Sequence, residues 1–125
     1  MIGAIIGDIV GSRFEFANHR KYDDFELFTS LSDFTDDTVL TIATAKVLLD
    51  GGDYTAVYRS FAQHYPARGY GGRFSRWIDS EYMGPYNSFG NGSAMRVSPV
   101  GFAFGDLETT LAEAKRSAEV THNHP

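Results

Sequence analysis

The feature of this sequence that most limits its possible folds is the helical spacing of its apolar residues. Four stretches each place apolar side chains on one stripe of a helix: residues 2–12, 36–50, 54–65 and 107–120. Asp53 and Asp106 are suited to cap the third and fourth of these helices, while Gly51-Gly52 and Pro66 are suited to end the second and third. Strand-like alternation is hard to find, so the sequence predicts a mostly α-helical fold.

Three smaller features refine this prediction. Gly3, Gly7 and Gly11 lie in the first stretch and predict that its helix packs closely against a neighbour. The apolar residues of 71–80 have helical spacing and indicate a short helix there. Residues 95–104 fit either a strand or a short buried helix.

A net charge of −5 and the absence of cysteine exclude several classes of function. Non-specific nucleic-acid binding requires clustered Lys and Arg, so we expect none here. Disulfides and thiolate metal sites are excluded because no thiol is present. The apolar N-terminus carries Asp8 in its middle and is too short to span a bilayer. We therefore expect a cytoplasmic protein, with residues 1–125 in one domain and no membrane segment.

The sharpest local motif is Phe34-Thr35-Asp36-Asp37-Thr38, immediately before an apolar helix. One interpretation is purely structural, because Thr35 is a good N-cap and acidic residues in a first turn complement the helix dipole. The other is a site for a hard cation, since a hydroxyl and two carboxylates supply three oxygen ligands on one rigid turn. The local pattern alone leaves both open.

A second acidic segment, Gly7 to Phe16, places Asp8 and Glu15 among apolar neighbours. Carboxylates that are buried or half-buried need a partner or a metal ion. Arg13 could pair with either of them, and Asp8 could instead accept hydrogen bonds from a nearby backbone or side chain.

Two further segments carry polar groups suited to a ligand. The segment from Phe89 to Arg96 contains Gly-Asn-Gly, which by itself indicates a tight turn built of residues that tolerate positive φ. If Ser93 begins a helix, its free N–H groups would form an anion site. His122 and His124 at the end of the chain fit either a ligand contact or a solvent-exposed tail.

Taken together and in this order, these motifs closely resemble the ADP-ribosylglycohydrolase family, which includes the dinitrogenase reductase-activating glycohydrolases and the crystallin J1-like proteins. The resemblance covers nearly the whole chain and is carried by four segments: Gly3-Ala4-Ile5-Ile6-Gly7-Asp8 through Phe14-Glu15, Phe34-Thr35-Asp36-Asp37-Thr38, Gly90-Asn91-Gly92-Ser93-Ala94-Met95-Arg96 and Thr121-His122-Asn123-His124-Pro125.

The resemblance implies an all-α orthogonal multi-helix fold with a binuclear Mg²⁺ or Mn²⁺ centre in a cleft. By position, it implies metal ligands at Glu15, Thr35, Asp36 and Asp37, with Glu15, Asp36 and Asp37 also catalytic. It further implies that an ADP-ribose pocket is lined by Gly90, Asn91, Gly92, Ser93, Met95, His122 and His124. The implied activity is hydrolysis of an N- or O-glycosidic bond that joins ADP-ribose to a substrate.

This chain departs from the family in length. Members are about twice as long, and their second half supplies an Asp-Thr-Asp-Thr-type element that completes the metal site. No Asp-x-Asp follows Asp37 here. We therefore expect an incomplete N-terminal portion of the fold, inactive alone, which needs a missing C-terminal half or a second chain.

Two alternatives to a glycohydrolase stay open from the sequence. One is a non-catalytic ADP-ribose or nucleotide-binding protein or a crystallin J1-like structural protein, and the other is a helical domain whose acidic residues only cap helices. An unpartnered apolar face on the 107–120 helix also predicts self-association.

Overall fold

The computed structural model describes residues 1–15 and 25–124, and every regular element in them is helical. The elements are α1 (Ile2–Gly11), the 3₁₀ turn η1 (Ser12–Phe14), α2 (Asp36–Asp50), α3 (Tyr54–His64), α4 (Gly72–Asp79), α5 (Gly92–Met95), α6 (Val100–Ala103) and α7 (Leu107–Glu119). The predicted all-α fold is confirmed. Phe16, the last residue of the second acidic segment, and Pro125, the last of the C-terminal motif, lie outside the described residues.

Side-chain caps explain why the long helices begin where they do. The side chains of Thr35, Asp53 and Asp106 each accept a hydrogen bond from a backbone N–H in the first turn of α2, α3 and α7. Helix α2 ends at Gly51, whose φ of 78° is unfavourable for residues with a side chain. The predicted caps and this stop are therefore confirmed, and so is the short helix within residues 71–80, which is α4.

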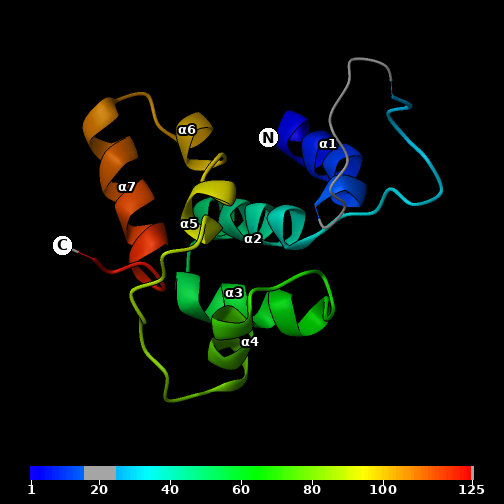
Figure 1. Ribbon diagram of the computed structural model, residues 1–125. Coiled ribbons are helices and arrows are strands. Elements are labelled where there is room, and N and C mark those ends of the chain that lie inside the picture. The colour runs from blue at the N-terminus through cyan, green and yellow to red at the C-terminus, as the bar shows by residue number, and fades with distance from the viewer. Residues whose placement is uncertain (16–24, 125) are drawn as a thin grey trace.

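The core lies where α2, α3 and α4 meet. Helix α7 lies beside α5 and α6 (Figure 1), and its Glu113 accepts a hydrogen bond from the hydroxyl of Tyr54 in α3. The buried members of the core are Leu40, Ala43, Val47, Tyr54, Tyr58, Ala62, Phe74, Trp77 and Ile78. Helix α2 is buried well beyond its apolar stripe, because Thr41 and Thr44 are also inaccessible to solvent. The Thr44 hydroxyl lies 2.8 Å from the Tyr58 hydroxyl and ties α2 to α3.

The prediction that three glycines let α1 pack closely against a neighbour is wrong for the described part of the chain. A Cβ atom added at Gly3, Gly7 or Gly11 would meet no atom within 4 Å, and no residue of α1 is buried. Helix α1 is held to α2 mainly by polar contacts from Asp8. Among the described residues, Ile5, Ile9 and Val10 of α1 are only half-buried, so apolar packing adds less than these polar contacts.

The ambiguity over residues 95–104 is resolved in favour of helix. Helix α6 forms there, and its Val100 is almost fully buried. None of the described helices is both long and apolar enough to cross a membrane.

Candidate functional site

The Asp8 carboxylate joins α1 to the beginning of α2. Its two oxygens accept hydrogen bonds from the Thr35 N–H (2.8 Å) and hydroxyl (2.6 Å) and from the Thr38 N–H (3.2 Å) and hydroxyl (2.6 Å). These are free donors of the first turn of α2, so Asp8 caps a helix that begins 28 positions after it in the sequence. One of the alternatives left open for Asp8, hydrogen bonding to backbone and side chain, is therefore confirmed.

Asp36 and Asp37 follow on the same turn, and their surroundings disfavour negative charge. Burial, with the negative charges of Asp37 and Glu15 next in importance, raises the pKa of Asp36 to about 6. Burial, and then the charges of Asp8 and Glu15, raises the pKa of Asp37 as well. Four carboxylates are thus close enough to repel one another, and a cation among them would relieve that repulsion.

Two details of the acidic segment differ from the sequence-based expectation. Glu15 was expected to be buried or half-buried, but it is exposed, because η1 ends there at the surface. Arg13 was a candidate partner for Asp8 or Glu15, but within the described residues its guanidinium donates to the Glu26 carbonyl and lies 4.5 Å from the centre of the Phe14 ring. No described cation therefore neutralises the acidic cluster.

A cavity of about 360 Å³ opens beside this cluster and is lined by Gly7, Asp8, Gly11, Ser12, Phe14, Glu15, Asp37 and Asn91. Its oxygen donors have the chemistry that Mg²⁺ and Mn²⁺ prefer. However, no three Asp, Glu or His side chains among the described residues lie close enough together to hold a metal ion. The oxygen atoms suit a hard cation chemically, but they do not converge on a single position. The assignment of Glu15, Thr35, Asp36 and Asp37 as metal ligands therefore stays a prediction.

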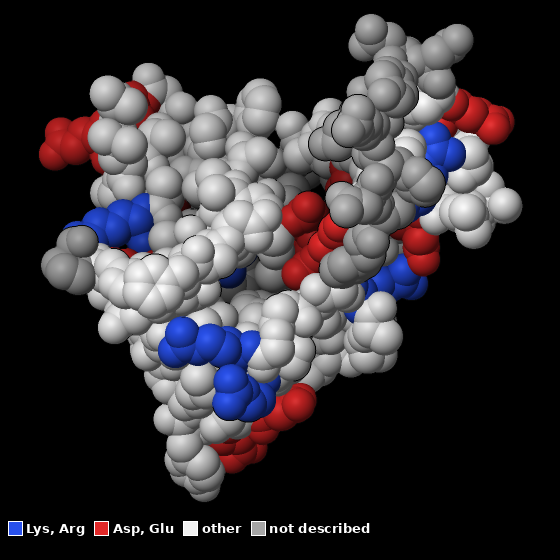
Figure 2. All heavy atoms as spheres, in the orientation of Figure 1, with Lys and Arg blue, Asp and Glu red and all other residues white. Residues whose placement is uncertain are grey.

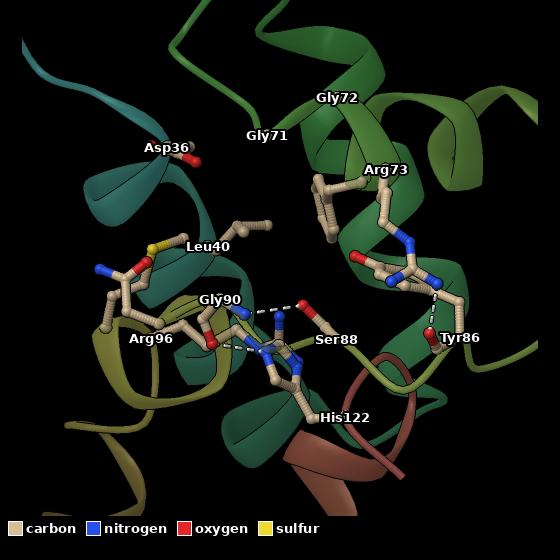
Figure 3. A pocket seen from close by; sticks show the side chains of 14 residues that line it. Asp36, Leu40, Gly71, Gly72, Arg73, Tyr86, Ser88, Gly90, Arg96 and His122 are labelled. Atoms are coloured by element: carbon tan, nitrogen blue, oxygen red, sulfur yellow. Dashed lines mark hydrogen bonds between the residues drawn. The ribbon is translucent and has the colours of Figure 1, made fainter. Parts of the chain in front are cut away.

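A second cavity, of about 280 Å³, shares the lining residue Asn91 with the first and is drawn in Figure 3. It is lined by Asp36, Leu40, Gly71, Gly72, Arg73, Phe74, Tyr86, Ser88, Gly90, Asn91, Gly92, Met95, Arg96 and His122. Asp36 lines this cavity while the adjacent Asp37 lines the first, and Asn91 lines both. The two cavities are therefore neighbours at the N-terminus of α2.

The Gly90-Asn91-Gly92 turn forms one wall of the second cavity without the positive φ angles that its composition suggested. Asn91 precedes α5 with φ −77° and ψ 0°, and neither glycine has positive φ. Helix α5 begins at Gly92 rather than Ser93 and has only four residues. Ser93 is half-buried and lines neither cavity.

The two histidines have different positions. The His122 Nε2 atom lies 2.9 Å from the Gly90 carbonyl oxygen, and its ring lines the second cavity. His124 does not line it, since its Nε2 atom lies 3.0 Å from the Asn87 carbonyl oxygen and its ring packs against Phe89. The structure thus brings together Asp36, Gly90, Asn91, Gly92, Met95 and His122, but not Ser93 or His124.

Cations lie across the second cavity from the acidic cluster. Figure 2 shows carboxylates gathered along one side of a hollow, with Lys and Arg side chains below it. Arg73 is one of the lining cations: it donates to the Tyr86 carbonyl at 2.7 Å and lies over the Tyr86 ring, opposite Asp36 in Figure 3. The hollow therefore offers negative charge at one end and positive charge at the other.

Sequence reasoning missed several residues of this cavity, above all Arg73, Tyr86 and Arg96. Arg96 ends the Gly90–Arg96 motif, so its place in the motif was a signal. Arg73 on α4 and Tyr86 in the segment between α4 and α5 carried no local signal, because only the tertiary structure brings them to the cavity.

The fold and cavities define a class of protein: an all-α domain with an acidic cluster at the start of a buried helix, beside a cavity walled by a glycine-rich turn. The family model described as ADP-ribosylglycohydrolase matches residues 1–125. The chain belongs to the ADP-ribosylglycohydrolase family.

Similar curated proteins are the ADP-ribosylhydrolases ARH3 of several vertebrates. The Gallus gallus protein is 28% identical over 98% of this chain and 43% of its own length. The Mus musculus protein is 32% identical, and the Homo sapiens protein 30%, each over 71% of this chain but only 29% and 30% of the relative. This chain thus spans less than half the length of these relatives. No solved structure was found to match it.

Proposed function

We propose that this chain forms part of a metal-dependent hydrolase that releases ADP-ribose from an ADP-ribosylated substrate. The observation that carries the proposal is the adjacency of the two cavities, with Asp36 and Asp37 each lining one of them and Asn91 lining both. A ligand in the second cavity would extend towards the acidic cluster. Family membership and the names of the vertebrate relatives support the same activity.

The acidic residues and the glycine-rich wall would have different roles, metal binding and ligand binding. Asp36, Asp37 and Glu15, with the Thr35 hydroxyl, would hold two Mg²⁺ or Mn²⁺ ions, which when bound would position the ribose hydroxyls and activate a water molecule. The wall of Gly90, Asn91 and Gly92 would contact the ADP-ribose. The position of Asp36, Asp37, Glu15 and the glycine-rich wall around the two cavities supports both assignments. Thr35 lines neither cavity, and its assignment rests on the family resemblance of the motif.

A second candidate function is ADP-ribose binding without catalysis, as in a crystallin J1-like or other non-enzymatic member. One observation favours it: the described acidic side chains do not converge closely enough to hold a metal ion. The second cavity would still bind a nucleotide in that case, since most of its lining lies outside the acidic cluster.

The first test is calorimetric titration of ADP-ribose into the protein, with Mg²⁺ and then with EDTA. We expect saturable binding that is tighter with Mg²⁺ and that is weakened by Asp36→Ala and by Asp37→Ala. Asp79→Ala is the matched control, because Asp79 is an exposed carboxylate at the far end of α4 that lines neither cavity.

Release of ADP-ribose from arginine- and serine-linked substrates then separates the two candidates, with the chain alone and with the C-terminal part of a relative added in trans. Binding without turnover in every combination would favour the non-catalytic function. Absence of ADP-ribose binding would refute both.

A further inference from the structure

The side chain of Arg96 is fully buried, although no described carboxylate pairs with it. Its Nη2 atom donates to the Ser117 carbonyl and to the Thr121 hydroxyl oxygen, both at 2.9 Å. Its guanidinium lies over the Tyr58 ring, 4.5 Å from the ring centre, and its Nε and Nη1 atoms have no hydrogen-bond partner among the described residues. A buried cation of this kind is costly, so its contacts call for an explanation beyond packing.

The guanidinium of Arg96 constrains the direction of the hydrogen bonds around Thr121. A guanidinium has donors and no acceptor, so the Thr121 oxygen must accept from it. The Thr121 hydroxyl hydrogen must then go elsewhere, and the His122 Nδ1 atom is 2.7 Å away whereas the Ala118 carbonyl is 3.5 Å away. The shorter distance favours Nδ1 as the acceptor of the Thr121 hydroxyl hydrogen, so Nδ1 itself carries no hydrogen.

The other ring nitrogen of His122, Nε2, has a partner that requires a hydrogen on it. His122 Nε2 faces the Gly90 carbonyl oxygen at 2.9 Å, and a carbonyl can only accept. A neutral imidazole with a bare Nδ1 carries its hydrogen on Nε2, which suits both neighbours. Figure 3 shows the bond from Nε2 to the Gly90 carbonyl. Burial is the largest influence on the His122 ring and lowers its pKa; Arg96 and His124 act in the same direction, while the bond to Gly90 opposes them, and the net lowering favours the neutral ring.

The ring that is fixed in this way also touches the start of α5. A Cβ atom on Gly92 would lie 3.4 Å from His122 Cε1 and 3.9 Å from Arg96 Nη1, so both side chains lie directly behind the glycine. His122 thus holds the turn at Gly90 by a hydrogen bond, and its ring occupies the space beside Gly92. The orientation of this ring therefore sets the shape of that wall of the cavity.

We propose that Arg96 and Thr121 are positioning residues that hold His122 as the neutral Nε2–H tautomer, which fastens the Gly90-Asn91-Gly92 wall in its ligand-binding shape. The inference rests on the proposed function only in naming ADP-ribose as the ligand that the wall receives.

The test compares Thr121→Val, which keeps the shape of the side chain but removes the hydroxyl, with Thr121→Ser, which keeps the hydroxyl. Long-range ¹H–¹⁵N NMR spectra at neutral pH report which ring nitrogen of His122 carries the hydrogen. We expect an Nε2–H pattern in the wild type and in Thr121→Ser, and a mixture of forms in Thr121→Val. ADP-ribose binding should weaken about tenfold in Thr121→Val and less than about twofold in Thr121→Ser, as expected for one lost positioning hydrogen bond.

Three results would overturn the inference. An Nδ1–H pattern in the wild type would do so without any variant, even if Thr121→Val failed to fold. An unchanged His122 pattern in folded Thr121→Val would refute the role of the hydroxyl, and unchanged ADP-ribose affinity would refute the role in shaping the wall. If the wild-type chain binds no ADP-ribose, the proposed function fails, whereas the NMR comparison still decides how the tautomer is fixed.

Discussion

Replacing Asp8 by alanine should release α1 from the rest of the molecule. The carboxylate accepts four hydrogen bonds from Thr35 and Thr38, and no residue of α1 is buried. Its apolar residues Ile5, Ile9 and Val10 are only half-buried, so among the described residues one polar group makes most of the specific contacts that hold this helix.

The size of the effect follows from these contacts. A hydrogen bond to a charged group contributes a net ~1.5–3 kcal/mol, so four independent ones would give at least roughly 6 kcal/mol. The four share one carboxylate that is only half-buried, so their energies do not add in full. Loss of negative charge at the N-terminus of α2 adds a few tenths of a kcal/mol or more. We expect Asp8→Ala to lower the free energy of unfolding by about 3 kcal/mol, and Asp8→Asn by about half as much, because an amide oxygen can still accept two of the four bonds.

Urea denaturation followed by circular dichroism measures this difference, and amide hydrogen exchange shows whether α1 loses protection before the core does. Asp50→Asn is the matched control: it removes an exposed carboxylate whose ion pair with Lys46 is on the surface, so it should cost less than about 0.5 kcal/mol. If Asp8→Ala costs less than about 1 kcal/mol, or if α1 exchanges no faster, the reasoning is refuted.

Three further predictions follow from single features. Asp36→Asn should stabilise the metal-free protein at pH 7 by about 1 kcal/mol after discounting for solvent screening. The gain should fade as the pH falls from about 6 towards 3.8, because the wild-type carboxyl becomes protonated over this range. Urea denaturation in EDTA measures the difference, and a difference that does not vary with pH would contradict the raised pKa of Asp36. Gly51→Ala should cost about 1–3 kcal/mol because of its positive φ, whereas Gly101→Ala, with open space around it and no positive φ, should cost nothing in thermal melting. Leu107 and Leu111 are 72% and 60% exposed on α7, so the protein should self-associate in sedimentation experiments. The variant in which both leucines are replaced by glutamate should not self-associate. A monomeric wild type at high concentration would contradict this prediction.

The helices could be predicted from the sequence because their signals are local. A capping side chain acts on backbone N–H groups two or three residues ahead, so Thr35, Asp53 and Asp106 could be recognised without any knowledge of the tertiary structure. The same holds for Gly51, whose conformation suits no other residue well. Apolar spacing likewise identified α4 between two glycine-rich segments.

The contacts that build the site could not be predicted, because they join distant residues. Asp8 accepts hydrogen bonds from residues that are 27 and 30 positions away in the sequence. Arg96 donates a hydrogen bond to a residue that is 25 positions away, Thr121. The apolar neighbours of Asp8 and the motif around Arg96 marked these side chains as candidates, but nothing in the local sequence identified their partners. The glycines of α1 misled for the same reason: small residues permit close packing, but only the tertiary structure decides whether a neighbour is there.

The two interpretations of the Thr35–Thr38 motif, cap and cation site, are not exclusive, and the structure shows how one supports the other. Asp8 occupies the N–H and hydroxyl groups of Thr35 and Thr38. Those are the donors that a carboxylate in a first turn would otherwise use, so Asp36 and Asp37 accept no hydrogen bond from any other described residue. Both side chains instead line the cavities, and their pKa values are raised by burial and by one another's charge. A cation would therefore gain most from Asp36 and Asp37 because Asp8 has taken over the capping.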